Sequence, residues 1–482
     1  MKQTFFATLT TLLLLPGAAV IKAQPGYSVT INIAGASEEK IRLAYHLGDK
    51  QYISDSTVTD KSGFCRFSGV EKLPSGVYMI VLPGNHFFEF LLSDDQHFDI
   101  SCELADPVSS LAFRGSVGND RFLEYQKNWK LLQEQAMELS EKLRSATQNG
   151  GSTTELRNQL AAQEKKMKQF LLETAERNKG SLLGAIALSI IPVEPVIPSV
   201  PEGIAKRDSI IRLMSYLSYK EHFFDNIDFS QPGLIRSPVL AGKLEQFFGQ
   251  VVIQMPDSII KEADRVIKMS EPQNEMFQYV AVWLFNRYAT SEYMGHDAVV
   301  VHLADSIYLS GKAPWITEEY RVDLAKRVEK LRPTLIGRKA TELIMNSFAG
   351  HYVSLYDVDA EFTILYFWEP DCGHCTVATP LLSKYYNENR DNGIEVFAVC
   401  TQSDREKWEK YIVENGLTWI NGWDPQRLSR FDVYYNVEST PLVYVLDSTK
   451  TIIAKRLSVE DIGKFIDNYR TFNMRVQSSS GR

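Results

Sequence analysis

The chain has 482 residues and a mass of 54.8 kDa, which exceeds one ordinary hydrophobic core and suggests about three domains. A composition of 44% hydrophobic and 23% charged residues excludes a wholly disordered chain, a collagen-like chain and a disulfide-dense small scaffold. The net charge of -8 without a basic run argues against nucleic acid as a partner, and five cysteines are too few for a disulfide framework.

The first 23 residues have the pattern of a secretory signal peptide. Lys2 precedes an apolar run that Pro16-Gly17 interrupts, and small residues lead to a predicted cleavage point after Ala23, with Ala19 as the alternative. An uncleaved membrane anchor is the other interpretation, although the apolar run is short and broken for a bilayer-spanning helix. The pattern predicts export to the periplasm or cell envelope, with no stable membrane span after cleavage.

Residues 24–115 are predicted to form a β-rich domain. Apolar residues alternate with polar ones from Tyr27 to Ile33, which is typical of a half-buried strand. Further apolar runs, separated by turn-forming residues, are Ile41–Tyr45, Val77–Leu82, His86–Leu92 and Phe98–Cys102. This spacing predicts an all-β sandwich, in which Cys65 and Cys102 are either isolated strand cysteines or a disulfide pair.

Residues 116–335 are predicted to form an all-α domain. An apolar stripe with alternating steps of three and four predicts a long helix; it comprises Phe122, Tyr125, Trp129, Leu132, Ala136, Leu139 and Leu143. Asn149-Gly150-Gly151 ends this helix and a second one follows, which favours an antiparallel hairpin over a dimerising coiled coil. Prolines at steps of three from Pro192 to Pro201 indicate a linker or surface loop, with a partner-binding motif as the alternative.

The motif that carries chemistry lies in the last 140 or so residues. The apolar run Glu361–Trp368 predicts a buried strand, and helical sequence follows Cys372-Gly373-His374-Cys375. Two cysteines three apart at a helix start can close a small disulfide, and the helix dipole and unpaired N–H groups stabilise the first thiolate. A zinc site would need further cysteine or histidine ligands, and the remaining cysteines are scattered singly. The motif therefore predicts a redox pair and no metal.

From about Gly337 to Arg470 the sequence resembles the thioredoxin-like superfamily, and within it the exported thiol–disulfide oxidoreductases of TlpA/ResA type. Trp368 stands four residues before Cys372 and Pro380 five residues after Cys375, as in that family. The segment Tyr435–Leu446 resembles the one that holds the family's cis-proline. The resemblance implies an α/β thioredoxin-like domain over residues 336–475, followed by a flexible tail at 476–482.

The resemblance also implies an activity and a set of site residues. Cys372 would attack a disulfide of a protein substrate and Cys375 would resolve the mixed disulfide. Trp368, Thr440 and Pro441 would contact the substrate, with Thr440–Pro441 as the cis bond. The implied partners are protein thiols and disulfides and a redox partner that the sequence does not name. No cofactor is implied, and the oligomeric state is left open.

Three departures from the family affect the chemistry. Tyr366 stands where many thioredoxins have a buried acid, so Glu369 is considered as the substitute proton acceptor. The charge of Asp371 would oppose the Cys372 thiolate by roughly 1.4 kcal/mol at ~6 Å and an effective dielectric of ~40. Positive character on His374 would stabilise the same thiolate. Because these effects have opposite signs, the sequence does not fix the reduction potential, which is expected between reductase-like and isomerase-like values.

Two other functions are considered for the same sequence. A peroxiredoxin-like thiol peroxidase would need a proline and a threonine before the cysteine, where this chain has Leu365 and Glu369. An envelope binding or scaffolding protein with a structural thioredoxin-like domain would have no need of the dithiol.

Cys400 is interpreted as a buried apolar side chain, with a third redox thiol as the alternative. Residues 27–335 are hypothesised to position or select protein substrates, or to mediate self-association.

Overall fold

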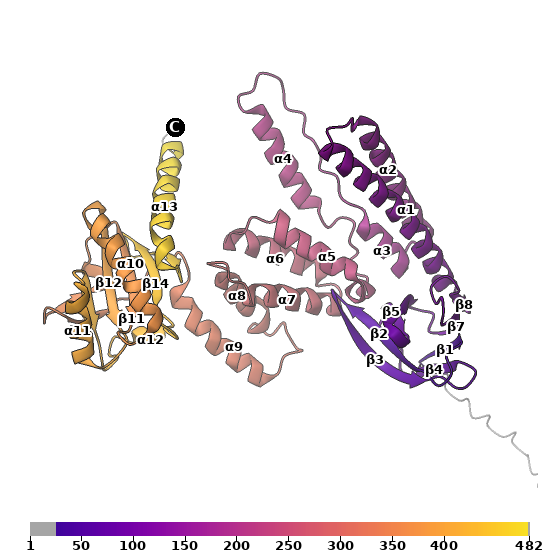
Figure 1. Ribbon diagram of the computed structural model, residues 1–482, viewed down its shortest axis with the longest axis horizontal. Coiled ribbons are helices and arrows are strands. Elements are labelled where there is room, and N and C mark those ends of the chain that lie inside the picture. Colours follow the sequence, from indigo (N-terminus) through magenta and orange to yellow (C-terminus); the bar gives the residue numbers. More distant parts are fainter. Residues whose placement is uncertain (1–25, 481–482) are drawn as a thin grey trace, which may run out of the picture. The chain divides into compact units, whose positions relative to one another are not determined.

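The computed structural model describes residues 26–480, and the side chains of residues 26–474. The chain divides into two compact units, one ending at Leu244 and the other beginning at Glu245 (Figure 1). The predicted signal peptide lies outside the described residues. Among the residues that are described, no helix combines the length and the apolar character needed to cross a membrane.

Two four-stranded sheets open the first unit, with strand orders β4-β1-β7-β8 and β3-β2-β5-β6. The strands are β1 (Tyr27–Ala34), β2 (Lys40–Leu47), β3 (Lys50–Val58), β4 (Phe64–Gly69), β5 (Gly76–Val81), β6 (Phe87–Leu92), β7 (His97–Glu103) and β8 (Ala112–Arg114), with the 3₁₀ turn η1 (Pro83–Asn85). Ile31 of the first sheet and Ile80 and Phe90 of the second belong to one buried cluster. The predicted β-sandwich is confirmed.

The two cysteines of the sandwich are free and buried. Cys65 on β4 is opposite Ile31 of β1, and Cys102 on β7 is opposite Ile33 of the same strand. Strands separated by one intervening strand lie roughly 10 Å apart, beyond the ~7 Å between Cα atoms that a disulfide spans. Burial raises the pKa of each thiol to about 11. These cysteines are therefore isolated core side chains.

Helices complete the first unit. They are α1 (Val117–Gln148), α2 (Thr154–Arg177), α3 (Leu182–Ile190), α4 (Arg207–His222), the 3₁₀ turn η2 (Pro232–Arg236) and α5 (Pro238–Gln246), which crosses the boundary between the units. Phe170 of α2 stacks on Tyr125 of α1, with ring centroids 5.9 Å apart. Gln163 Nε2 donates to the Leu132 carbonyl at 2.9 Å. Later residues of α2 thus contact earlier residues of α1, as in the predicted antiparallel hairpin.

The second unit begins with a helical part. It comprises the π-helical turn η3 (Phe247–Val251), α6 (Pro256–Ser270), α7 (Asn274–Ala289), α8 (Asp297–Leu303), the π-helical turn η4 (Ala304–Tyr308), α9 (Glu318–Leu331) and the 3₁₀ turn η5 (Arg332–Thr334). Its core contains fully buried residues from successive helices, among them Ile259, Val280, Leu284 and Val299. The residues predicted to be helical, 116–335, are thus helical but divided between the two units.

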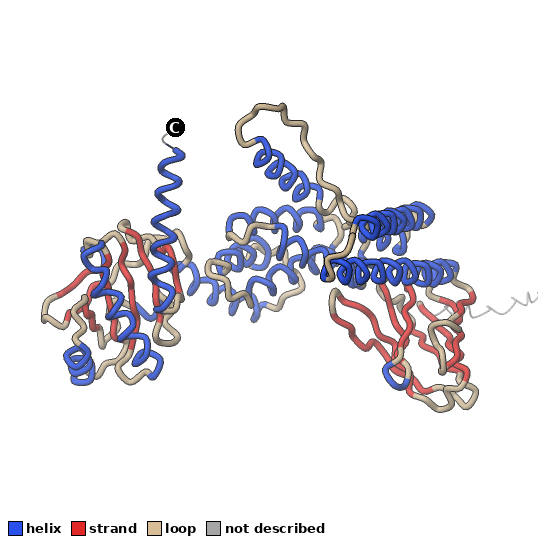
Figure 2. Tube along the Cα trace, turned by 45° about the horizontal axis from the view of Figure 1, so that its top comes forward, coloured by secondary structure: helices blue, strands red, loops and turns tan. Residues whose placement is uncertain are grey.

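A seven-stranded sheet completes the second unit, in the order β10-β9-β13-β12-β11-β14-β15 (Figure 2). Its strands are β9 (Ile344–Ser347), β10 (Tyr352–Ser354), β11 (Phe362–Trp368), β12 (Ile394–Cys400), β13 (Ile420–Trp423), β14 (Leu442–Asp447) and β15 (Ile452–Lys455). The helices are η6 (Leu355–Asp357), α10 (Gly373–Asn389), η7 (Arg390–Asn392), α11 (Arg405–Asn415), α12 (Phe431–Tyr434) and α13 (Val459–Ser480). Helix α13 continues into the segment for which the sequence predicts a tail.

Strand β11 is buried on both faces because helices cover both sides of the sheet. Tyr366 and Trp368 pack into a cluster with residues of α10, α11 and α13. Leu365 and Phe367 pack into a second cluster with Phe431 of α12. A strand covered in this way is apolar along its whole length instead of alternating. The arrangement confirms the thioredoxin-like α/β fold, and it places the end of β11 where α10 begins.

Candidate active site

Cys372 caps the amino terminus of α10. Strand β11 ends at Trp368, and the next four residues turn the chain so that Cys372 has an extended backbone before the first helical residue, Gly373. The Cys372 Sγ accepts a hydrogen bond from the Cys375 backbone N–H at 3.4 Å. The N–H groups of a first helical turn have no partner within the helix, so they stabilise a negative sulfur at this position.

The chain returns to Cys372 from 68 residues further along. The Cys372 Sγ lies 3.3 Å from the carbonyl oxygen of Thr440, and the peptide bond between Thr440 and Pro441 is cis. A thiol donates to this carbonyl only while it is protonated, so this contact belongs to the neutral form. The site therefore combines the start of α10 with the start of β14.

The two thiols have pKa values shifted in opposite directions. Partial burial raises the pKa of Cys372, but hydrogen bonds from the Thr440 and Cys375 side chains and from the backbone of Cys375 and His374 outweigh it, so the net shift is downward. Burial and the hydrogen bond to Cys372 raise the pKa of Cys375 to about 12. Cys372 is half-buried whereas Cys375 is fully buried. Cys372 is thus the more accessible thiol and the one with the lower pKa, whereas the raised pKa of Cys375 keeps this buried thiol protonated near neutral pH.

The prediction that Trp368 contacts the substrate, which the resemblance implies, does not agree with the structure. Its side chain is 0% exposed, and its ring lies 5.0 Å from the ring of Tyr411 of α11. The indole Nε1 is buried and has no hydrogen-bond partner among the described residues. Trp368 therefore cannot reach a substrate in this structure and instead packs beneath the cysteine pair.

Tyr366, which stands where many thioredoxins have a buried acid, contacts another hydroxyl group. The Tyr366 hydroxyl lies 3.0 Å from Thr379 Oγ1 of α10, and burial raises the pKa of Tyr366 well above its ordinary value. The carboxylate of Glu369 accepts hydrogen bonds from Thr401 Oγ1 at 2.8 Å and from Gln402 Nε2 at 3.2 Å. These bonds fix Glu369 at the end of β12, next to the strand that leads to Cys372.

The charges around Cys372 differ from what the sequence alone indicates. Asp371 Oδ2 lies 2.6 Å from Lys407 Nζ of α11, and both side chains are about half exposed. This ion pair reduces the negative field that Asp371 would otherwise impose on the Cys372 thiolate. His374 is exposed in the first turn of α10. The sequence offered no signal for Lys407, because it lies 35 residues after Cys372 on another helix.

Cys400 ends β12 directly beside Trp368 of β11. Its side chain is 1% exposed, and burial raises the pKa of this thiol to about 12. A buried thiol that stays protonated is a poor nucleophile. The structure thus favours the interpretation of Cys400 as a core side chain.

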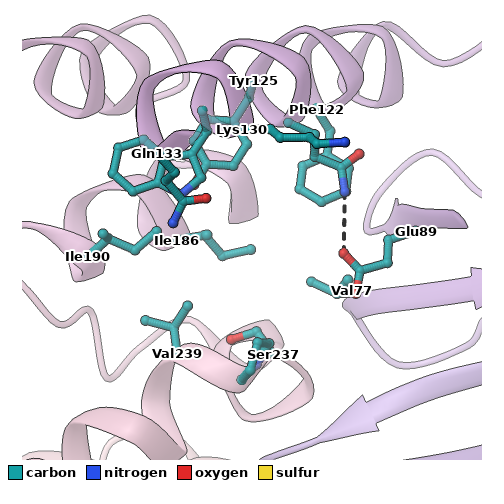
Figure 3. Close-up of a pocket in the computed structure, with 13 residues that line it drawn as sticks. Val77, Glu89, Phe122, Tyr125, Lys130, Gln133, Ile186, Ile190, Ser237 and Val239 are labelled. Carbon is teal, nitrogen blue, oxygen red and sulfur yellow. Dashed lines mark hydrogen bonds between the residues drawn. The ribbon is translucent and has the colours of Figure 1, made fainter. Parts of the chain in front are cut away.

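A separate cavity of about 350 Å³ lies in the first unit, between α1, α3 and the strands β5 and β6 (Figure 3). Glu89 Oε2 accepts a hydrogen bond from Gln126 at 3.3 Å, and Glu89 Oε1 lies 2.8 Å from His46 Nε2. Apolar side chains form most of the remaining wall; they include Phe122, Trp129, Ile186 and Val239. The residues that line this cavity include no cysteine.

Comparisons with known proteins concern the part of the chain that contains these residues. Residues 336–455 match the AhpC/TSA family. The chain is 26% identical over 141 residues to the thiol-disulfide oxidoreductase ResA of Geobacillus kaustophilus, covering 28% of this chain and 78% of the relative. It is 23% identical over 83 residues to ResA of Halalkalibacterium halodurans, covering 17% of this chain and about half (47%) of the relative.

Solved structures also resemble the carboxyl-terminal part of the chain. A domain of a possible thiol-disulfide isomerase from Cytophaga hutchinsonii is 39% identical, with coverage of 29% of this chain and 97% of that domain and a TM-score of 0.28. The thioredoxin domain of a thiol-disulfide oxidoreductase from Bacteroides vulgatus is 26% identical. The match covers 28% of this chain and 96% of that domain, with a TM-score of 0.27.

The fold, the dithiol at the start of α10 and the curated relatives define a thiol–disulfide oxidoreductase of the thioredoxin-like class. Residues 336–455 match the AhpC/TSA family model, and the curated relatives that this part of the chain resembles are thiol–disulfide oxidoreductases of ResA type.

Proposed function

We propose that the chain is an exported oxidoreductase that exchanges disulfides with protein substrates through Cys372-Gly373-His374-Cys375. The observation that carries the proposal is the position of Cys372. Its sulfur lies at the helix start, 3.4 Å from the Cys375 N–H and 3.3 Å from the Thr440 carbonyl. A single accessible thiol is thus next to a second thiol and next to backbone that can pair with a substrate.

The exchange proceeds in two steps. The Cys372 thiolate attacks one sulfur of a substrate disulfide, a mixed disulfide forms, and the other substrate sulfur leaves as a thiolate. Cys375 then loses its proton and attacks the Cys372 sulfur, which releases the second substrate thiolate and leaves the Cys372–Cys375 disulfide. Glu369 is the proposed acceptor of the Cys375 proton, since Thr401 and Gln402 hold its carboxylate in place. In the oxidised protein the same steps run in reverse.

Thr440 and Pro441 are the proposed substrate-binding residues. In the chain they directly precede β14, which pairs with β11 on the other side from β12. The backbone of Thr440 would pair with an extended segment of the substrate and hold its cysteine against Cys372. This geometry fits a polypeptide substrate because main-chain hydrogen bonds recognise any extended segment.

The protein is also proposed to act outside the cytoplasm, with a role for the residues that precede the thioredoxin-like domain. The amino-terminal pattern supports export to the periplasm or cell envelope, where a redox partner would reset the cysteine pair. Residues 27–335 are proposed to position or select protein substrates, or to mediate self-association.

A peroxidase function is not favoured by the site. Leu365 is a fully buried residue of β11, and Glu369 occupies the position where a threonine hydroxyl would face the reactive cysteine. A purely structural domain is not favoured either, because it would need neither a thiol of lowered pKa nor a buried second thiol beside it.

The proposal predicts a reduction potential between about -270 and about -180 mV for the Cys372–Cys375 pair. The expected value is intermediate because the lowered pKa of Cys372 favours the dithiol form, whereas the negative charge of Asp371, which Lys407 only partly compensates, opposes the Cys372 thiolate. Equilibration of the full chain in glutathione buffers, followed by alkylation and mass analysis, measures it. A pair that remains a dithiol throughout the titration would contradict the proposal.

A further inference from the structure

A second cavity lies within the second unit, at the end of β15. Its volume is about 510 Å³, inside the range of ~300–1,000 Å³ that is usual for binding pockets. One wall is the segment 291–297, which precedes and enters α8. The facing wall is the connection 456–458 between β15 and α13. We call this space the flanking cavity.

The flanking cavity lies at the same end of the sheet as Cys372. The carbonyl of Val443, three residues after Thr440, accepts a hydrogen bond from the Arg456 backbone N–H at 2.7 Å. Leu457, the next residue along, packs against the buried cluster that Cys372 also contacts. The 456–458 wall of the cavity is thus joined to β14 a few residues after the point where Thr440 and Pro441 lead into that strand.

A buried ion pair holds the two walls together. Lys455 Nζ contacts Asp297 Oδ2 and donates to the Thr334 carbonyl at 2.8 Å. The Lys455 backbone N–H donates to Met294 Sδ at 3.3 Å. Because these contacts join β15 to the segment 291–297, the cavity is formed before any substrate arrives.

The lining of the flanking cavity combines apolar and acidic groups. Tyr293 is 71% exposed and Met294 is 38% exposed, which leaves a large apolar surface on one wall. The charged residues outside the Lys455–Asp297 pair are Glu292, Arg456 and Asp461, so the lining has one net negative charge. Such a lining fits an aromatic side chain together with a basic one.

We propose that the flanking cavity holds the segment of a substrate protein next to its reactive cysteine, and that it selects an aromatic residue adjacent to lysine or arginine. The occupant is a polypeptide because the 456–458 wall is hydrogen-bonded to β14, the strand that follows Thr440, where a substrate backbone would pair. This inference rests on the proposed function and adds a substrate preference to it. Tyr293 and Glu292 are the residues that determine the preference.

The test uses the full chain with Cys375→Ser, so that the reaction stops at the mixed disulfide. Each short peptide carries one cysteine linked to thionitrobenzoate and a dipeptide next to it, either Tyr-Lys or Gly-Ser. In one set of peptides the dipeptide precedes the cysteine, and in a second set it follows the cysteine. The Cys372 thiolate attacks the peptide sulfur, and thionitrobenzoate leaves as a coloured thiolate. Each rate is divided by the rate of the same variant with the small reagent dithiobis(nitrobenzoate).

A Tyr-Lys peptide is expected to react about tenfold faster than its Gly-Ser counterpart, as for one aromatic anchor at an interface. In the Tyr293→Ala/Glu292→Gln variant this advantage disappears. Tyr352 of β10 is 73% exposed and does not line the flanking cavity, so Tyr352→Ala is the matched control and keeps the advantage.

Three outcomes overturn the inference or its basis. Equal rates for both peptides in the parent chain would exclude a preference, and an advantage that survives in the double variant would place it elsewhere. A chain in which Cys372 reacts with neither peptide nor the small reagent would instead contradict the proposed function. The two failures are therefore distinguishable.

Discussion

Replacing Cys375 with serine is expected to convert the enzyme into a trap for its substrates. Cys372 remains able to attack a substrate disulfide, because its lowered pKa arises partly from the backbone N–H groups that the serine variant retains. The resolving thiol is absent, so the mixed disulfide accumulates instead of decaying. Non-reducing electrophoresis of the variant with a disulfide-containing protein should show a covalent complex in most of the molecules that have reacted.

The rate of trapping should depend on pH in a defined direction. Since the thiolate is the nucleophile and the pKa of Cys372 is lowered, the rate rises with pH and levels off at a lower pH than for an ordinary cysteine thiol. The double variant Cys372→Ser/Cys375→Ser is the control and should form no complex. If the control formed as much covalent complex as Cys375→Ser does, the reaction would belong to another cysteine.

Removing the amine of Lys455 is expected to destabilise the second unit by about 3–5 kcal/mol, as for other buried ion pairs that lose one partner. The side chains of Lys455 and Asp297 are only 8% and 19% exposed. Asp297 Oδ1 already has no hydrogen-bond partner among the described residues, and in Lys455→Met its Oδ2 loses the ammonium as well. The variant therefore leaves a desolvated carboxylate with neither counter-charge nor hydrogen bond.

Tryptophan fluorescence during guanidinium unfolding measures this effect selectively. Six of the seven tryptophans lie after Glu245, and Trp129→Phe removes the remaining signal of the first unit. The double variant Lys455→Met/Asp297→Leu replaces both charges with apolar groups and should regain most of the loss. Equal stability of the single variant and the parent would show that the pair is not buried in solution.

The sequence predicted where the two neighbouring cysteines lie because the determinants of their position are local. A wholly apolar strand followed by two cysteines at a helix start places Cys372 and Cys375 without reference to the rest of the chain. Cys372 and Thr440 are 68 residues apart in the sequence, and only the resemblance to a known family indicated that they are in contact.

Other features could not be predicted because they depend on tertiary contacts. Strand β3 was missed because it is exposed along nearly all of its length and shows no apolar alternation. Trp368 was assigned to the substrate, but α11 brings Tyr411 over it and the side chain is buried. The pairing of Asp371 with Lys407, and that of Lys455 with Asp297, joins elements far apart in the chain.

The most direct test of the account is insulin-disulfide reduction by the full chain, with dithiothreitol as the reductant. The wild-type protein is expected to accelerate the reaction, Cys372→Ser to fall to the uncatalysed rate, and Cys400→Ala to retain the wild-type rate. Equal acceleration by the wild-type protein and Cys372→Ser would contradict the assignment of catalysis to this thiol.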